Sequence, residues 1–224
     1  TLDILEQVPR AEVFQREFDA HTPQWNYGLS RVKTEWVLSL DADYVLSDRL
    51  IEEMDSIEPV SSINGYRAEF TYRVFGVPLR GSLYPPRRVL FRNETARYVQ
   101  DGHTQRLDLE GETAQLGGTI YHDDRKPLGR WLRSQRSYTE AELKKYRETP
   151  WSDLSWPDRL RRTKWAPLAM FAYCLLGKGL LLDGPAGWYY TFQRTYAELL
   201  LALALMDEDL RPDAGSSTSP NEPL

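Results

Sequence analysis

Apolar and polar positions alternate in two different ways along the chain, and the change falls near residue 127. Before that point, short runs with an apolar residue at every second position are separated by glycine, proline and asparagine, which is typical of β-strands joined by turns. After it, apolar residues recur at helical spacing. The pattern predicts an α/β domain at residues 1–126, a helical region at 127–210 and a tail at 211–224 that is too polar to fold.

The clearest strand pattern lies at residues 63–77, where aromatic and aliphatic side chains occupy alternate positions. An uninterrupted apolar run at residues 35–40 predicts a buried central strand. Shorter strands are expected at residues 12–18, 88–91, 97–100 and 116–121. Helices are expected at residues 2–7, at 49–57 after the capping pair Ser47 and Asp48, and at 128–147, with a loop feeding a helix at 22–32.

Two apolar segments, at residues 166–182 and 188–206, flank a glycine- and proline-containing turn. The first is shorter than the roughly 20 residues that span a bilayer and contains Lys178, so no transmembrane helix is expected. The chain opens on Thr1 without a signal peptide, and we expect it to begin inside a longer protein.

Charge and cysteine content restrict the partners and the compartment. The formal net charge of -5 and the pI near 5.4 give no overall attraction to nucleic acid, so no nucleic-acid partner is expected. The single cysteine, Cys174, cannot form an internal disulfide and reads as a small buried apolar residue. These features fit a cytoplasmic protein.

The sequence Asp41-Ala-Asp43 directly follows the apolar run at 35–40. Alternate residues of an extended segment share a face, so both carboxylates are expected on one side of the chain at the end of a strand. Ligands of α/β sheets bind at that edge. Two carboxylates suit Mg²⁺ or Mn²⁺, whose remaining positions accept substrate phosphates. The alternative interpretation is a solvated loop that carries two charges. The residues around Asp41 and Asp43 favour a metal site over such a loop.

Residues 25–44, which read Trp-Asn-Tyr-Gly-Leu-Ser-Arg-Val-Lys-Thr-Glu-Trp-Val-Leu-Ser-Leu-Asp-Ala-Asp-Tyr, resemble family 2 glycosyltransferases of the GT-A type. Residues 1–6 resemble the segment after the family's Ser-x-Asp-x-Thr signature, and residues 84–122 its acceptor-side half. Leu-Leu-Asp-Gly-Pro-Ala-Gly at 181–187 is similar to bacterial members that extend lipopolysaccharide cores and related envelope glycans. The resemblance implies a GT-A fold, a Rossmann-like mixed sheet flanked by helices, with the nucleotide-binding start missing before residue 1 and a helical extension at the C-terminus.

The resemblance also implies roles on the donor side. Asp41 would contact the nucleotide ribose or a water held by the metal, and Asp43 would bind the divalent metal that bridges the two phosphates. His122 would complete the metal shell or hydrogen-bond a phosphate, with a surface turn as its alternative. Tyr44 stands where many members have glutamate. Asn26 and Arg88 are further candidates for donor binding, with a helix cap and a solvent-facing strand edge as their alternatives. Arg87 and Arg92 could line the donor or acceptor phosphate site together with Arg88.

An acceptor hydroxyl that attacks the anomeric carbon must lose its proton to a base. Asp101 and His103 are the candidates in Asp-Gly-His. Asp101 is the more usual base in the family, and His103 is the closer positional match, so Asp101 is narrowly preferred.

The resemblance predicts an inverting hexosyl or heptosyl transferase that takes a nucleotide-sugar donor and an envelope glycan or lipid-linked acceptor. Two alternatives stay open: a non-catalytic or incomplete fragment that binds membrane or a partner, and a metal-dependent phosphotransferase, which would lack the usual glycine-rich phosphate loop. The sequence does not determine the oligomeric state.

A dense run of cations precedes the first apolar segment of the helical region, with three tryptophans nearby; it comprises Arg159, Arg161, Arg162 and Lys164. Such a run suits a peripheral seat on the inner face of the plasma membrane. A helical hairpin packed on the catalytic domain or on a second subunit fits the same pattern equally well.

Overall fold

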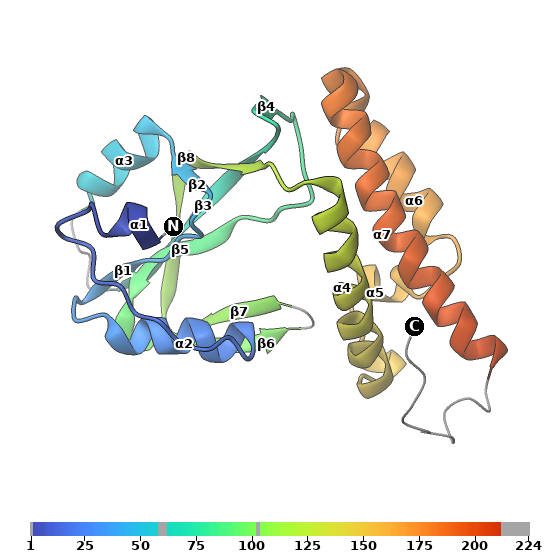
Figure 1. Ribbon diagram of the computed structural model, residues 1–224, viewed down its shortest axis with the longest axis horizontal. Coiled ribbons are helices and arrows are strands. Elements are labelled where there is room, and N and C mark those ends of the chain that lie inside the picture. The colour runs from blue at the N-terminus through green and yellow to red at the C-terminus, as the bar shows by residue number, and fades with distance from the viewer. Residues whose placement is uncertain (1, 58–61, 102–103, 212–224) are drawn as a thin grey trace.

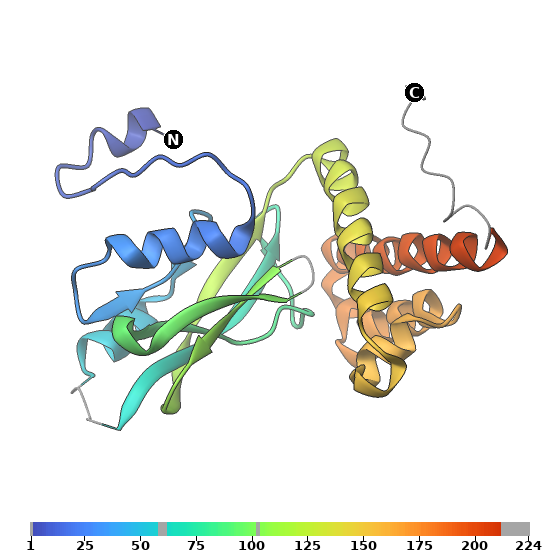
Figure 2. The same cartoon turned by 90° about the horizontal axis from the view of Figure 1, so that it is seen from below.

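The computed structural model describes residues 2–57, 62–101 and 104–211 and shows two lobes side by side (Figure 1). We call residues 2–124 the α/β lobe and residues 128–211 the helical lobe. The second view shows the same separation, with α4 leading from one lobe into the other (Figure 2).

The strands of the α/β lobe are β1 (Trp36–Leu38), β2 (Tyr44–Leu46), β3 (Ile63–Val74), β4 (Val77–Pro78), β5 (Arg87–Arg92), β6 (Ala96–Asp101), β7 (Thr104–Leu109) and β8 (Glu112–Asp124). The α-helices are α1 (Leu2–Leu5), α2 (His21–Arg31), α3 (Asp48–Asp55), α4 (Leu128–Glu148), α5 (Trp156–Arg161), α6 (Ala166–Ala172) and α7 (Gly184–Leu210). Short 3₁₀ segments lie at Asn93–Thr95, Trp151–Asp153 and Leu180–Asp183, and a π-helical turn at Tyr173–Gly177 continues α6.

The larger sheet is mixed and curled, with the order β1-β5-β3-β8-β2 and β4 beside β3. β3 and β8 run parallel, and the other neighbours are antiparallel. The β6–β7 hairpin forms a separate two-stranded sheet under α2, while α3 packs on β8 (Figure 1). The predicted α/β fold, a mixed sheet flanked by helices, is confirmed at this level.

Gly118 shows how closely α3 approaches the sheet. A Cβ atom at this position would lie 2.4 Å from the Leu50 Cα, so only glycine fits. The helix begins as the sequence predicts, because the Ser47 side chain accepts a hydrogen bond from the Leu50 N–H.

The prediction of a central strand at residues 35–40 is wrong. β1 spans only Trp36–Leu38 and lies at an edge of the sheet, with β5 as its one neighbour among the described strands. Val37 is nevertheless buried, because it packs with Phe91 and with Tyr98 and Leu107 of the β6–β7 hairpin. Its apolar character thus reflects cover from another layer, which a sequence pattern cannot distinguish from strands on both sides.

Three further expectations for the α/β lobe need correction. The described residues 12–18 form no strand, and Val13, Phe14 and Phe18 are exposed. The strand expected at 63–77 ends at Val74, because the positive φ angles of Phe75 and Gly76 reverse the chain into β4. The loop expected from residue 22 is already helix α2, and β7 was not expected at all.

One apolar cluster joins the two lobes. Tyr72 and Leu79 of the α/β lobe pack with Cys174, Leu180 and Tyr190 of the helical lobe, and Cys174 is buried as predicted. The Leu83 N–H donates a hydrogen bond to the Tyr190 hydroxyl at 2.8 Å. The lobes are therefore packed together through side chains that lie next to the end of β3.

Of the helices in the described part of the chain, none alone is both long and apolar enough to cross a bilayer. Ala166–Gly177 and Leu180–Leu210 reach that length and hydropathy only as a pair, across a bend of 71°.

Candidate functional site

The Asp41-Ala-Asp43 segment forms a tight turn. The Tyr44 N–H donates to the Asp41 carbonyl oxygen at 3.1 Å, so the prediction of an extended segment is wrong. The turn joins β1 at one edge of the sheet to β2 at the other. In a flat sheet those edges would be about 19 Å apart, from four spacings of about 4.8 Å. So few residues containing a turn cannot cover that distance, and the curl of the sheet is what lets them connect its edges.

Strand pairing brings Asp43 against His122. Tyr44 of β2 lies opposite His122 of β8, and the Asp43 Oδ2 lies 3.4 Å from the His122 Nε2. The Asp43 side chain is 47% exposed and that of His122 only 11%. The interaction with the His122 imidazole lowers the pKa of Asp43 below its ordinary value. Asp43 therefore presents an ionised carboxylate to solvent from a buried support.

Three tyrosine rings surround the His122 imidazole. The rings of Tyr44, Tyr72 and Tyr84 lie 5.2, 4.9 and 5.0 Å from it, all edge-on. The His122 Nδ1 is buried and has no hydrogen-bond partner among the described residues. A proton on Nε2, facing Asp43, satisfies more of the ring than one on Nδ1. This tautomer makes His122 a group that orients Asp43.

Two of these tyrosines, Tyr44 and Tyr84, carry hydroxyls that remain protonated close to the acidic turn. Those of Tyr44 and Tyr84 hydrogen-bond to each other. Burial raises the pKa of Tyr84, and the negative charges of Asp41 and Asp43 raise it further. Burial also raises the pKa of Tyr98, again with a contribution from Asp41. Both aspartates therefore lie within electrostatic reach of one group of neutral hydroxyl donors.

One arginine supplies positive charge beside this group. The Arg87 guanidinium lies 4.6 Å from the centre of the Tyr84 ring, and its charge counteracts the rise in the pKa of Tyr84 and of Tyr98. The Arg88 guanidinium instead donates to the Leu107 carbonyl oxygen at 3.1 Å and so ties β5 to β7. Arg87 is consequently the better placed of the two for a ligand phosphate, although the sequence favoured Arg88.

Asn26 has a structural partner. Its carboxamide donates to the Tyr98 carbonyl and accepts from the Tyr98 N–H, both at 2.9 Å. Asn26 lies inside α2, whose N-cap is Ala20, so the helix-cap alternative is wrong. The Tyr98 hydroxyl in turn hydrogen-bonds the Ser39 hydroxyl at 2.7 Å, next to the aspartate turn. Asn26 thus fixes β6 relative to that turn.

The two candidate bases lie at the end of the β6–β7 hairpin. Asp101 is the last residue of β6 and pairs with Thr104 of β7. His103 lies outside the described residues, as do the contacts of the Asp101 side chain. The choice between them stays a prediction.

The carboxylates of the acidic turn suit a divalent cation only if a bound substrate supplies further oxygen atoms to the cation. Within residues 2–57, 62–101 and 104–211, no group of three or more histidine, cysteine, aspartate or glutamate side chains is arranged to hold a metal. Mg²⁺ and Mn²⁺ commonly bind one or two protein carboxylates, with water and substrate phosphates in the other positions. The ionised Asp43, with Asp41 and His122 nearby, suits such shared binding. Asp123 and Asp124 are engaged elsewhere, with the Gly76 N–H and the Tyr72 hydroxyl.

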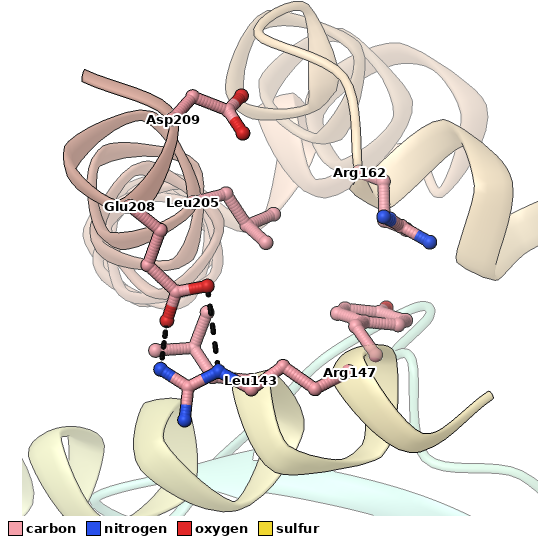
Figure 3. A pocket seen from close by; sticks show the side chains of 7 residues that line it. Leu143, Arg147, Arg162, Leu205, Glu208 and Asp209 are labelled. Carbon is pink, nitrogen blue, oxygen red and sulfur yellow. Dashed lines mark hydrogen bonds and ion pairs between the residues drawn. The ribbon is translucent and has the colours of Figure 1, made fainter. Parts of the chain in front are cut away.

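A separate recess of about 140 Å³ lies in the helical lobe (Figure 3). It is lined by Leu143, Tyr146, Arg147, Arg162, Leu205, Glu208 and Asp209. An ion pair between Arg147 of α4 and Glu208 of α7 closes one side of it. Its charged groups serve helix packing, and the chemistry expected from the sequence lies in the other lobe.

Tyr72, Tyr84 and Tyr98 were not identified as site residues from the sequence. Tyr72 falls in the alternating pattern of β3, where an inward tyrosine is indistinguishable from a core residue. Tyr84 could have been identified from the sequence, because it directly precedes Pro-Pro-Arg-Arg and so lies in a turn next to two cations.

Fold and site together define an α/β protein with a curled mixed sheet and a tyrosine-lined acidic turn that joins its two edges. A scan against protein-family models finds no matching family, and a search of curated proteins finds no relative. The function is therefore inferred from the residues of the site.

Proposed function

We propose that this chain is a GT-A type, family 2-like glycosyltransferase that moves a hexose or heptose from a nucleotide-sugar donor, with inversion, to an envelope glycan or lipid-linked acceptor. The supporting observation is the Asp43 carboxylate held against the buried His122 at the acidic turn. The resemblance of residues 25–44 to that family points to the same turn.

On the donor side, the turn offers an anionic centre beside neutral and cationic donors. Asp43 would hold Mg²⁺ or Mn²⁺ together with the donor's phosphates, with Asp41 as a further oxygen ligand, while His122 orients Asp43 through its Nε2 proton. A bound cation neutralises the charge that develops on the departing diphosphate. Tyr44 and Tyr84 hydrogen-bond to each other and so keep one free hydroxyl proton between them, which, with the Arg87 guanidinium, would donate hydrogen bonds to phosphate oxygens.

On the acceptor side, the β6–β7 hairpin carries the candidate base. Asp101, or His103 in its place, takes the proton of the acceptor hydroxyl while that oxygen bonds to the anomeric carbon and the diphosphate leaves. The bonds from Asn26 to Tyr98 and from Tyr98 to Ser39 hold β6 close to the acidic turn. These hydrogen bonds are consistent with a base on the β6–β7 hairpin and a donor site at the acidic turn that act on the same transferred sugar.

Donor binding is the direct test. A panel of nucleotide sugars is added to the full chain with and without Mn²⁺, and the thermal midpoint is measured. A donor at a hundredfold its Kd stabilises the folded state by about 2.7 kcal/mol. We expect this shift to require Mn²⁺ and to be lost in Asp43→Asn. Where transfer is measurable, Asp43→Ala should lower kcat roughly 100-fold or more, the scale of removing one preorganised charged group.

Asp55→Asn is the matched control, because Asp55 is an exposed carboxylate at the end of α3. It should keep the full Mn²⁺-dependent shift. Equal shifts in Asp43→Asn and in the unsubstituted chain would contradict the proposal, as would a panel in which no nucleotide sugar raises the midpoint.

A further inference from the structure

The outward side of α7 carries a continuous row of exposed apolar residues, which we call the outer stripe. Its members are Phe192, Tyr196, Leu199, Leu203, Met206 and Leu210. They recur at spacings of four and three residues, and at 3.6 residues per turn they fall within an arc of about 80°. Tyr190 and Leu201, which are buried, lie on the opposite side of the helix. The outer stripe therefore lies on the side of α7 opposite these buried residues, and Tyr196 at its edge packs on the Trp131 ring of α4 at 5.7 Å.

The apolar surface continues from α7 onto α6. Phe171 of α6 stacks on Phe192, and Trp188 packs on the same ring at 5.5 Å. Leu176 and Leu182, on either side of the bend between α6 and α7, are both exposed. Figure 1 shows α6 and α7 together on the side of α4 away from the sheet, with only the N-terminal part of α7 reaching the end of β3.

Acidic groups at this surface are confined to its C-terminal end, where Asp207, Glu208 and Asp209 precede Leu210, and the long stretch before them exposes none. Residues 164–206, all of which the structure describes, contain only two acids, Asp183 and Glu198. Their side chains are 6% and 8% exposed, and they pair with Arg80 and Arg161. A surface that meets water alone has no need to exclude carboxylates in this way, whereas a surface that meets anionic lipid does.

A cation and a tryptophan lie at the margin of the layer, just before α6. Lys164 is exposed and lies over the Trp165 ring at 5.6 Å. Arg162, over the Trp151 ring at 5.3 Å, instead lines the recess beside Glu208 and Asp209. Exposed Trp beside Lys and Arg is typical of groups at the level of lipid headgroups. Arg161, which the sequence placed in this basic patch, is instead committed to Glu142 and Glu198.

From these observations we infer that the α6–α7 layer docks the protein on an anionic lipid surface, with α7 in the membrane plane and the outer stripe in the interfacial region. The outer stripe, from Phe192 to Leu210, is about 27 Å long at 1.5 Å per residue. On the other side of α7, Tyr190 contacts Tyr72 at 5.1 Å, and Tyr72 contacts His122 at 4.9 Å. In the docked protein, the α6–α7 layer would thus lie between the lipid surface and the acidic turn. It goes beyond the proposed transfer reaction and does not depend on it.

Vesicle flotation tests the inference with the full chain. Vesicles of phosphatidylcholine alone are compared with vesicles that also contain phosphatidylglycerol. We expect binding to the anionic vesicles and a roughly tenfold weaker binding to the neutral ones, because cations and buried apolar area act together. Leu199→Glu/Leu203→Glu should lower binding to the anionic vesicles at least tenfold. These side chains are 44% and 53% exposed, so the fold should tolerate the change.

Ile4→Glu/Phe18→Glu is the matched control, since both residues are exposed apolar side chains of the α/β lobe. It should bind anionic vesicles like the unsubstituted chain. Unchanged binding by the stripe variant, or no binding of the unsubstituted chain, overturns the inference. A lipid-free dimer that the stripe variant converts to monomer in sedimentation equilibrium also overturns it, because the stripe is then an interface between copies. Donor-induced thermal shifts of the same variants report separately on the proposed transferase.

Discussion

Each lobe contains a cluster of charged side chains, and the two clusters differ in how far their polar groups are paired with one another. In the helical lobe, Arg161 donates to Glu142 and Glu198, whose side chains are each 8% exposed, so two enclosed carboxylates share one cation. In the α/β lobe, Asp43 is half exposed and its support, His122, keeps a buried nitrogen that no described residue hydrogen-bonds. The difference separates a charge cluster that holds three helices together from one that still has capacity to bind a ligand.

Burial gives the two clusters opposite sensitivities. Removing one partner from a buried ion cluster leaves the remaining charges without compensation, and the cost appears as lost stability. Removing a half-exposed carboxylate leaves little that is unpaired, so the cost appears in ligand binding. We therefore expect substitutions at buried charges to lower stability and substitutions at exposed charges of the site to lower ligand binding. Single substitutions test this.

The largest effect on stability is expected for Arg161→Ala. It removes the Arg161 charge that the buried Glu198 and Glu142 share, and should lower the free energy of unfolding by about 3–5 kcal/mol. Urea unfolding followed by circular dichroism measures it. Arg136→Ala is the control, because Arg136 is 87% exposed in its pair with Glu140 and should cost under about 1 kcal/mol. Equal losses in the two variants would remove the distinction between the lobes.

Tyr190→Phe should have an intermediate effect. Tyr190 is fully buried, and its hydroxyl accepts the Leu83 N–H across the contact between the lobes. Without that acceptor the free energy of unfolding should fall by about 1–3 kcal/mol. Tyr196→Phe, at an exposed position of the same helix, should stay within about 0.5 kcal/mol of the unsubstituted chain. Similar urea midpoints for both variants would show that the lobes do not depend on this bond.

Features set by neighbouring residues were predictable from the sequence. Ser47 caps α3, β3 keeps its alternation, and α4 runs almost over its expected length, because capping and periodicity act within a few residues. β7 was missed because its polar residues Thr104, Gln105, Arg106 and Asp108 dilute the alternation around Leu107.

Features set by distant partners were not predictable. The sequence pointed to Asp43 and His122 separately, but their contact depends on the pairing of β2 with β8. Arg161 looked like one member of a basic patch, because its partner Glu198 lies on a helix formed much later in the chain. The edge position of β1 likewise depends on the order of the whole sheet.

Glu53 offers the smallest effect and sharpens the comparison, because it is a satisfied carboxylate close to the surface. It accepts the N–H groups of Gly117 and Gly118 at 2.7 and 2.9 Å. The bond from Gly118 is the main cause that lowers the pKa of Glu53 below its ordinary value. A folded-state pKa below the unfolded one stabilises the protein at neutral pH, and this contribution is lost as the pH falls through the acidic range to the folded-state pKa.

Glu53→Gln should therefore lower the urea midpoint at pH 7 by less than Tyr190→Phe does, and the difference from the unsubstituted chain should shrink as the pH is lowered below the ordinary pKa of a glutamate. Glu52→Gln, at the exposed neighbouring position, controls for the loss of one charge from α3. If the Glu53→Gln difference stayed constant with pH, the carboxylate would contribute through shape alone. If Glu53→Gln lowered the free energy of unfolding as much as Arg161→Ala does, hydrogen bonding alone would make a charged group important for stability, whether or not it is buried.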